Sequence, residues 1–335
     1  MYKALREAIP IIDAAIGKIV RLVGGVQVKC SDKSAEKLLS DFLYTVPTGP
    51  VSSGIESFIS STVDRLLTYG TAVNEMVLDN SGKLTALYTA ALDNLELSVD
   101  DNPLYPVIRN QSGDKVPYPE RIMITALSPD PDSAYGNSLL KGLPFVSEVL
   151  LKIYNTIGVN FERLGNLRFA VTYRPSDAQA GISENRADEI ASAWSDAMRD
   201  SSTVKDFVAV GDVDIKVIGG DAIMPDIEVP IRTLTEQIIA KTGLPPFLLG
   251  LTWSTTERMS SQQADILTSE LEYYRTLITP AILKICRTFL RGEGYCCDLS
   301  LEWNNISLQD EITLAQAKLL HAQADKTIKE TGDKK

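Results

Sequence analysis

The chain has 335 residues, 44% of them hydrophobic, and a formal net charge of −11. This length predicts one large or two ordinary domains, and no apolar run is long enough to cross a bilayer. The acidic balance argues against a protein that coats nucleic acid, because coating requires clustered Lys and Arg to displace counterions from phosphates.

The first part of the chain predicts a mixed α+β domain. Helices are expected at 1–24, 31–43 and 53–69, with an interruption of the first at Pro10. The hydrophobic period then changes to two, which is typical of strands. A short strand is expected at 26–30, and the further expected strands cover 72–78, 84–88, 95–99, 106–109 and 122–126. A turn-rich run at Ser128–Ser138 closes this part.

A small insert is expected between two helices in the middle of the chain. The first helix is predicted at 139–164, from apolar residues at helical spacing. The insert, about 167–220, should hold a strand, a helix that begins at Ser183 and a hairpin. The hairpin pairs 207–210 with 215–218 around Gly211-Asp212. Two helices that flank a compact insert predict a stalk that carries a head.

The second flanking helix begins near Glu228 and ends at Gly243, a residue suited to a helix C-terminus. Pro245 and Pro246 forbid its continuation. A short apolar plug, Phe247–Leu249, follows and is closed by Gly250.

A polar loop is then expected at Thr252–Ser261, followed by a long helix that reaches Leu290. Pro280 lies inside the pattern of this helix and predicts a kink or a local break. The residues expected on its apolar side are Ile266, Leu267, Leu271, Tyr274, Leu277, Ile278, Ala281, Ile282 and Ile285. A strand at 297–303 and a last helix at 307–331 complete the chain.

Three segments in this order resemble the portal proteins of tailed bacteriophages, the subunits of the head–tail connector. The segments are the helix followed by TGLPPFLLG, a polar loop and a long helix at 224–290; YGNSLLKGLPFVSEVLLKIYNTIGVNFERLGN at 135–166; and TYGTAVNEMVLDNSGKLTALYTA at 68–90. The resemblance covers roughly residues 1–290. Their order and spacing, rather than any single motif, identify the family.

The resemblance implies an α+β fold with a mixed wing domain, two stem helices around a small α/β clip, a long kinked helix and a short helical crown. The expected parts are the N-terminal wing (1–136), first stem helix (137–166), clip (167–223), second stem helix (224–243), tunnel loop region (244–262), C-terminal wing (263–304) and crown (305–335). The natural chain is expected to start further upstream, and the single crown helix to be either a minimal crown or a shortened one.

The resemblance also implies a structural function. A portal subunit forms a ring, a dodecamer in the virion, at one capsid vertex. Double-stranded DNA passes through the ring during packaging and ejection. The implied partners are other copies of the chain, DNA, the terminase or packaging ATPase, the major capsid or scaffold protein, and head–tail adaptors, with no membrane. The ring would be assembled in the host cytoplasm and reside in the virion.

Candidate channel residues fall in two places. The tunnel loop candidates are Thr252, Trp253, Ser254, Thr255, Thr256, Glu257 and Arg258. The candidates on the channel side of the second stem helix are Arg232, Glu236, Gln237 and Lys241. Low apolar content between two patterned helices predicts a mobile loop. Trp253 would contact DNA or pack the loop against the next subunit, and packing is the favoured hypothesis.

Two alternatives belong to other classes. One is a metal-dependent nucleic-acid-processing enzyme that uses loop carboxylates such as Asp130 and Asp132. The other is a monomeric helical scaffold. Neither a phosphate-binding loop nor a nucleophile elbow is present, and His321 is the single histidine. We therefore expect no enzymatic activity, no cofactor and no metal.

The four cysteines, Cys30, Cys286, Cys296 and Cys297, lack C-x-x-C spacing. They are expected to be reduced thiols.

Overall fold

The computed structural model divides the chain into a larger unit, residues 1–148 and 233–335, and a smaller unit, residues 149–232. Within them it describes residues 1–99, 106–165, 168–173, 188–189, 191–192, 195, 213–218, 227–251 and 257–306. Side chains at 163–165, 168–173, 213–218 and 257–261 are not described.

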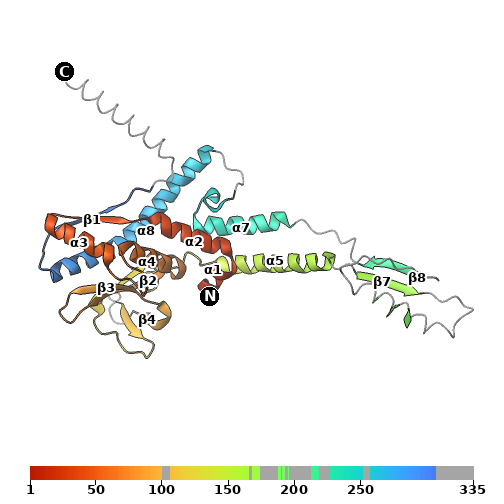
Figure 1. Cartoon of the computed structure of the whole chain (residues 1–335), viewed down its shortest axis with the longest axis horizontal. Coiled ribbons are helices and arrows are strands. Elements are labelled where there is room, and N and C mark those ends of the chain that lie inside the picture. The colour runs from red at the N-terminus through yellow and green to blue at the C-terminus, as the bar shows by residue number, and fades with distance from the viewer. Residues whose placement is uncertain are drawn as a thin grey trace, which may run out of the picture. The chain divides into compact units, whose positions relative to one another are not determined.

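The elements are labelled in chain order (Figure 1). The helices are α1 (Tyr2–Ala8), α2 (Pro10–Val23), α3 (Lys33–Thr45), α4 (Ile55–Tyr69), α5 (Leu143–Gly165), α7 (Glu228–Thr242) and α8 (Glu257–Gly292), with short 3₁₀ helices η1 (Leu92–Asn94), η2 (Pro119–Arg121) and η3 (Pro246–Leu249). The strands are β1 (Val26–Cys30), β2 (Thr71–Leu78), β3 (Leu84–Thr89), β4 (Leu95–Ser98), β5 (Val107–Asn110), β6 (Ile122–Ala126), β7 (Arg168–Tyr173), β8 (Val213–Ile218) and β9 (Leu299–Trp303).

The predicted first helix is two helices in the structure. Ile9 separates α1 from α2 with an extended backbone, φ −125° and ψ 96°. The cause is Pro10, since the ring of a proline disfavours helical geometry in the residue before it. Pro10 itself opens α2, where its missing N–H removes no helical hydrogen bond. The predicted interruption at Pro10 is confirmed as a complete break.

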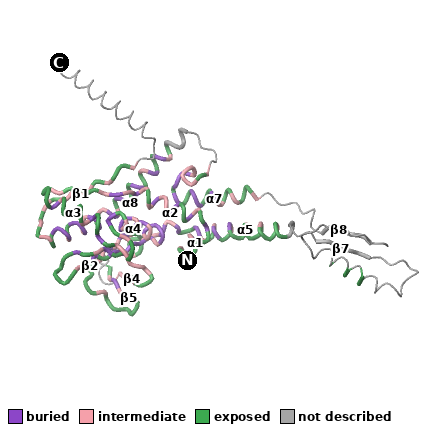
Figure 2. Tube along the Cα trace, viewed as in Figure 1, coloured by how far each residue is buried: buried purple, intermediate pink, exposed green. Residues whose placement is uncertain are grey.

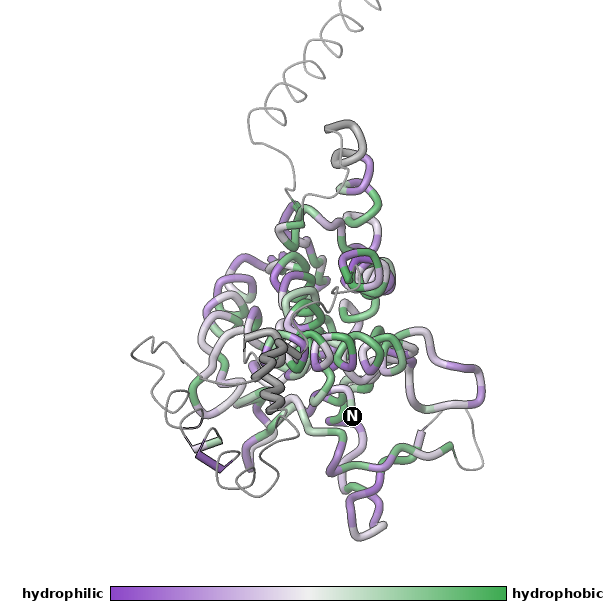
Figure 3. The backbone as a smooth tube through the Cα atoms, turned by 90° about the vertical axis from the view of Figure 1, so that its right-hand side faces the viewer, coloured by the Kyte–Doolittle hydropathy of each residue, from purple (hydrophilic) through white to green (hydrophobic). Residues whose placement is uncertain are grey.

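Helix α2 packs against both α4 and α8 in the core of the larger unit (Figure 1). The buried residues (purple in Figure 2) recur at helical spacing on each helix, and they include Ile12, Ile16, Phe58, Leu66, Leu271 and Ile278. Hydrophobic and hydrophilic stretches alternate along the helical parts of the chain (Figure 3), as amphipathic helices require. The core therefore joins the beginning of the chain to its C-terminal third.

Helix α8 continues through Pro280. A local break at this residue, one of the two outcomes expected from the sequence, is therefore wrong. Ile278 and Ile282 are buried on either side of the proline, so the helix keeps its packed face without interruption. The predicted apolar side is wrong at Ile266, because the side chain of this residue is 64% exposed.

The strands form small antiparallel sheets within the larger unit. Strand β2 lies at the centre of the order β3-β2-β6 and packs against α4. Its first residues, Thr71 to Asn74, are all buried. Helix α4 covers one side of the strand, and Val73 packs with Leu97 and Ile108 on the other. Strands β4 and β5 form a second sheet. These strands confirm the predicted mixed α+β character of this region.

Strands β1 and β9 pair although most of the sequence separates them. Val26 lies opposite Trp303, and Cys30 lies opposite Leu299. The sequence predicts both strands but not their pairing, because the alternating pattern of a strand does not indicate which distant strand pairs with it.

The smaller unit contains most of α5, the antiparallel pair β7–β8 and the first turn of α7. The partner of β8 is β7, from Arg168 opposite Ile218 to Tyr173 opposite Val213. This pairing is not the predicted hairpin, whose other half at 207–210 lies outside the described residues. Of the predicted helix from Ser183, only 188–189, 191–192 and 195 are described, and they are helical. The predicted crown helix also lies outside the described residues.

Two glycines allow a close backbone crossing beside β2. Gly70 ends α4 with φ +81°, and a Cβ on this residue would collide with the backbone of residues 136–138. A Cβ on Gly136 would in turn collide with the carbonyl of Gly70 and the backbone of Leu127. The crossing is held by the Leu127 N–H, which donates to the Gly70 carbonyl at 2.7 Å.

We expect Gly136→Ala to lower the free energy of unfolding by about 3 kcal/mol, because backbone on both sides leaves no room for a methyl group. Thermal unfolding of the purified protein measures the change. Gly158→Ala is the matched control, since nothing lies within 4 Å of a Cβ at this helical position. An unchanged midpoint for Gly136→Ala would contradict the close crossing.

Candidate functional site

All four candidates on helix α7 are exposed. Arg232, Glu236, Gln237 and Lys241 lie away from the buried side of the helix. The buried side consists of Thr235, Ile238, Ile239 and Thr242. At 100° per residue the candidates form two pairs, Arg232 with Glu236 and Gln237 with Lys241, spread over about half of the helix circumference. This face of α7 is therefore polar and exposed to solvent.

A tight turn follows α7. The Gly243 N–H donates to the Ile239 carbonyl at 3.1 Å, and Gly243 takes φ +69°, which glycine adopts without strain. Leu244 and Pro245 are buried beneath the turn. The predicted apolar plug forms the 3₁₀ helix η3, whose residues Phe247 to Leu249 are half-buried. Gly250 closes it with φ +78°.

The predicted loop at Thr252–Ser261 is too long. Helix α8 begins at Glu257, so Glu257 and Arg258 lie in its first turn rather than in a loop. The residues from Glu257 to Gln263 are mostly Glu, Arg, Met, Ser and Gln, a set with good or moderate helix propensity and few apolar side chains. The hydrophobic period therefore begins later than the helix. The candidates from Thr252 to Thr256 lie outside the described residues.

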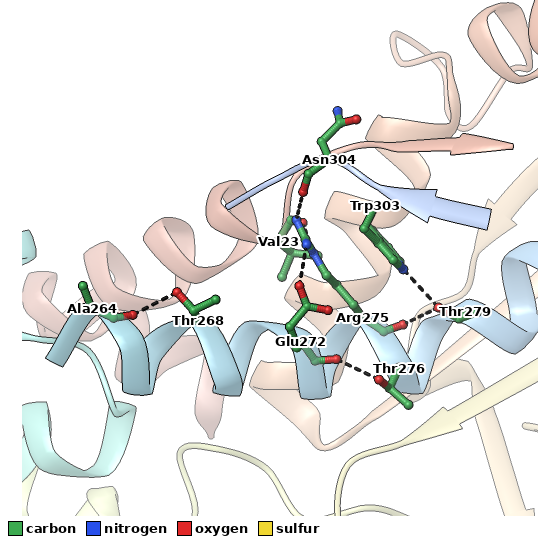
Figure 4. A network of polar contacts seen from close by, with 9 residues as sticks. All are labelled: Val23, Ala264, Thr268, Glu272, Arg275, Thr276, Thr279, Trp303 and Asn304. Atoms are coloured by element: carbon green, nitrogen blue, oxygen red, sulfur yellow. Dashed lines mark hydrogen bonds and ion pairs between the residues drawn. The ribbon is translucent and has the colours of Figure 1, made fainter. Parts of the chain in front are cut away.

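The position of α8 depends on a buried arginine that the sequence analysis did not single out. Arg275 is 3% exposed. Its Nε donates to the Val23 carbonyl at the end of α2, and one terminal nitrogen donates to the Asn304 carbonyl just after β9, both at 2.8 Å. The other terminal nitrogen pairs with Glu272 at 2.8 Å (Figure 4). One guanidinium thus joins three parts of the chain.

Aromatic and hydroxyl contacts surround this arginine. Its guanidinium carbon lies 5.2 Å from the centre of the Trp303 ring, within the range of a cation–π contact. The Trp303 indole N–H donates to the Thr279 hydroxyl at 3.1 Å, and that hydroxyl donates to the Arg275 carbonyl at 2.7 Å (Figure 4). Together these contacts attach the β1–β9 sheet to the middle of α8.

The position of this arginine in the sequence indicates that it is buried. Leu271, Arg275, Ile278 and Ile282 share one helical stripe, and the other three are buried. A charged residue inside such a stripe is buried only when it is paired or hydrogen-bonded.

No protein-family model and no curated protein matches the chain. Solved structures do match over nearly its whole length. The neck of a native gene transfer agent (GTA) particle, computed with C12 symmetry, has a TM-score of 0.68 at 14% identity and covers 96% of this chain and 88% of that chain. The virion of a native GTA particle gives 0.66 at 15% identity, with 97% and 89% covered.

The crystal structure of an HK97 family phage portal protein from Corynebacterium diphtheriae also matches. Its TM-score is 0.50 at 14% identity, and the match covers 88% of this chain and 92% of that chain. The chain has the fold of a phage portal protein. The α+β architecture implied by the resemblance is thereby confirmed. In the described part of the chain, no helix of this portal fold is long and apolar enough to cross a membrane.

We expect Arg275→Lys to lower the free energy of unfolding by about 2–3 kcal/mol. The shorter, non-planar ammonium cannot reach the Val23, Asn304 and Glu272 oxygens together, so buried acceptors lose their donors. Denaturant unfolding measures the change. Arg287→Lys on the exposed side of the same helix is the control and should change little. Equal effects of the two substitutions would show that the arginine network contributes no special stability.

Proposed function

We propose that the chain is a portal subunit. Copies assemble into a ring at one vertex of a capsid, and double-stranded DNA passes through the ring into the head and out again. The likeness to a particle neck with C12 symmetry and to a phage portal protein supports this proposal. The role is structural, and the chain would reside in the virion.

The observation that carries the proposal is the surface of helix α5. From Leu151 to Glu162, every residue is exposed or half-buried (Figure 2). Several of these residues are large and apolar, with exposed fractions of 39% for Leu151, 47% for Tyr154 and 61% for Phe161. A helix with this composition is stable in water when other helices cover it. Neighbouring copies in a ring would supply that cover.

The charge of the chain fits a channel that does not hold DNA tightly. With a net charge of −11, the ring repels phosphates on average, which lowers sticking during passage. We assign the channel surface to Thr252 to Arg258 and to the polar face of α7 with Arg232, Glu236, Gln237 and Lys241. Polar and basic residues there would give weak, salt-sensitive contacts.

The division into wing, stem, clip, tunnel loop and crown is part of the same proposal. Residues 167–223 would form the clip that meets the packaging ATPase and later the head–tail adaptors. The wing, residues 1–136 and 263–304, would face the capsid or scaffold protein, and residues 305–335 would form the crown.

The ring proposal predicts that charge on α5 blocks assembly. Tyr154→Glu with Phe161→Glu, on one helical stripe, should convert rings to monomers, because a buried unpaired carboxylate at each interface is costly. Native mass and electron imaging give the oligomeric state. Asn155→Glu, at an exposed polar position of the same helix, is the control. Rings that persist in the double variant would count against α5 as the interface.

The tunnel-loop proposal predicts separate effects on assembly and on packaging. A Gly-Ser linker of equal length in place of Thr252–Thr256 should leave rings intact and reduce packaged DNA, because the residues that contact DNA are gone. Packaged DNA per particle is the measurement. The same exchange at Asn80-Ser81, in the β2–β3 turn, is the control and should package normally. Normal packaging by the loop variant would overturn the assignment.

A further inference from the structure

Strand β1 has one open edge. Its partner in the described structure is β9 alone. The Asn304 N–H donates to the Gly25 carbonyl at 3.0 Å, and the Ser31 N–H donates to the Asp298 carbonyl at 3.2 Å. In an antiparallel pair, such bonds alternate along the strand. The odd-numbered residues therefore bond to β9, whereas the peptide groups of Val26, Val28 and Cys30 face the other way.

Among the described residues, one of these outward groups is capped. The Cys30 N–H donates to Glu36 Oε2 at 2.8 Å, which confirms its outward direction. In the described part of the chain, no recorded bond reaches the outward side of Val26 or Val28. Within the described chain, the N–H and carbonyl groups of Val26 and Val28 are therefore left for another strand.

A groove lies along this edge. Its volume is about 810 Å³, and its walls are β1, one side of α3 and the start of α4. Lining residues with charged or aromatic side chains include Lys33, Lys37, Asp41, Tyr44 and Glu56. A short strand with a lysine can remain unpaired in a folded protein. This edge differs from an ordinary unpaired edge, because the groove beside it provides space for the side chains of an added strand.

The charges differ between the two ends of the groove. Lys33 and Lys37 are exposed at the Cys30 end, and no ion pair among the described residues engages either one. Glu56 lies at the other end, where a Cβ on Gly25 would collide with its carboxylate. A strand antiparallel to β1 enters beside the lysines and leaves beside Glu56. An added strand that matches the charges of the groove therefore has an acidic residue first and a basic residue last.

We propose that β1 accepts an extended segment of a different protein as a third, antiparallel strand, with an acidic residue beside Lys33 and Lys37 and a basic residue beside Glu56. Main-chain bonds to Val26 and Val28 provide affinity, and the charge order provides direction. This inference is independent of the ring and of the channel assignment.

The probe is the synthetic peptide acetyl-Glu-Val-Thr-Val-Thr-Lys-amide, titrated into the full chain. We expect saturable binding and slower amide hydrogen exchange at Val26 and Val28. The peptide with Lys first and Glu last should bind about tenfold more weakly, because each end then meets a like charge. Lys33→Glu with Lys37→Glu, both on the exposed side of α3, should remove this preference without unfolding the chain.

Backbone pairing is tested separately. Val28→Pro removes one outward N–H and leaves the ladder to β9, so peptide binding should be lost, whereas Val28→Thr should retain it. Equal affinity for the two peptides, or unchanged exchange at Val26 and Val28, would overturn the proposal. Slow exchange at these amides in rings without peptide would assign the edge to a second copy of the chain and would also overturn it.

Discussion

The buried guanidinium of Arg275 is the constraint on which the larger unit depends. Removing a charge from water costs several kcal/mol unless the protein supplies equivalent partners. Here the partners are the carbonyls of Val23 and Asn304 and the carboxylate of Glu272. The Val23 carbonyl belongs to the last turn of α2, where unpaired carbonyls and the helix dipole favour a cation. Burial of this guanidinium therefore costs least when α2, the end of β9 and α8 meet at one point.

Helix α8 extends this constraint in both directions. Toward its end, Phe289 stacks on Phe42 of α3 with ring centres 3.9 Å apart. At its beginning, Glu257 directly follows the candidate tunnel loop. The buried side of this helix begins a little later, at Ala264.

Local patterns in the sequence predict most of the elements but not the contacts between distant ones. The break at Pro10 and the stop at Gly243 follow from the chemistry of single residues. The pairing of β1 with β9 does not, since a strand pattern is compatible with any partner of the right length. Helix α8 starts earlier than predicted, because helix propensity sets its first turn, whereas the hydrophobic period begins only further along the helix. The hydrophobic period predicts a buried Ile266, but this period does not indicate how far along the helix other elements pack against it.

The residues that form the core differ from those proposed to contact neighbouring copies. The larger unit buries its own apolar residues, such as Ile16 and Leu271, in one core. Helix α5 instead leaves Tyr154 and Phe161 exposed within the single chain. In the proposed ring, neighbouring copies would bury more area on α5, and substitutions there would change the strength of assembly while the core of the larger unit stays intact. The open edge of β1 lies in the larger unit, so occupation of that edge does not compete with α5 for the same residues.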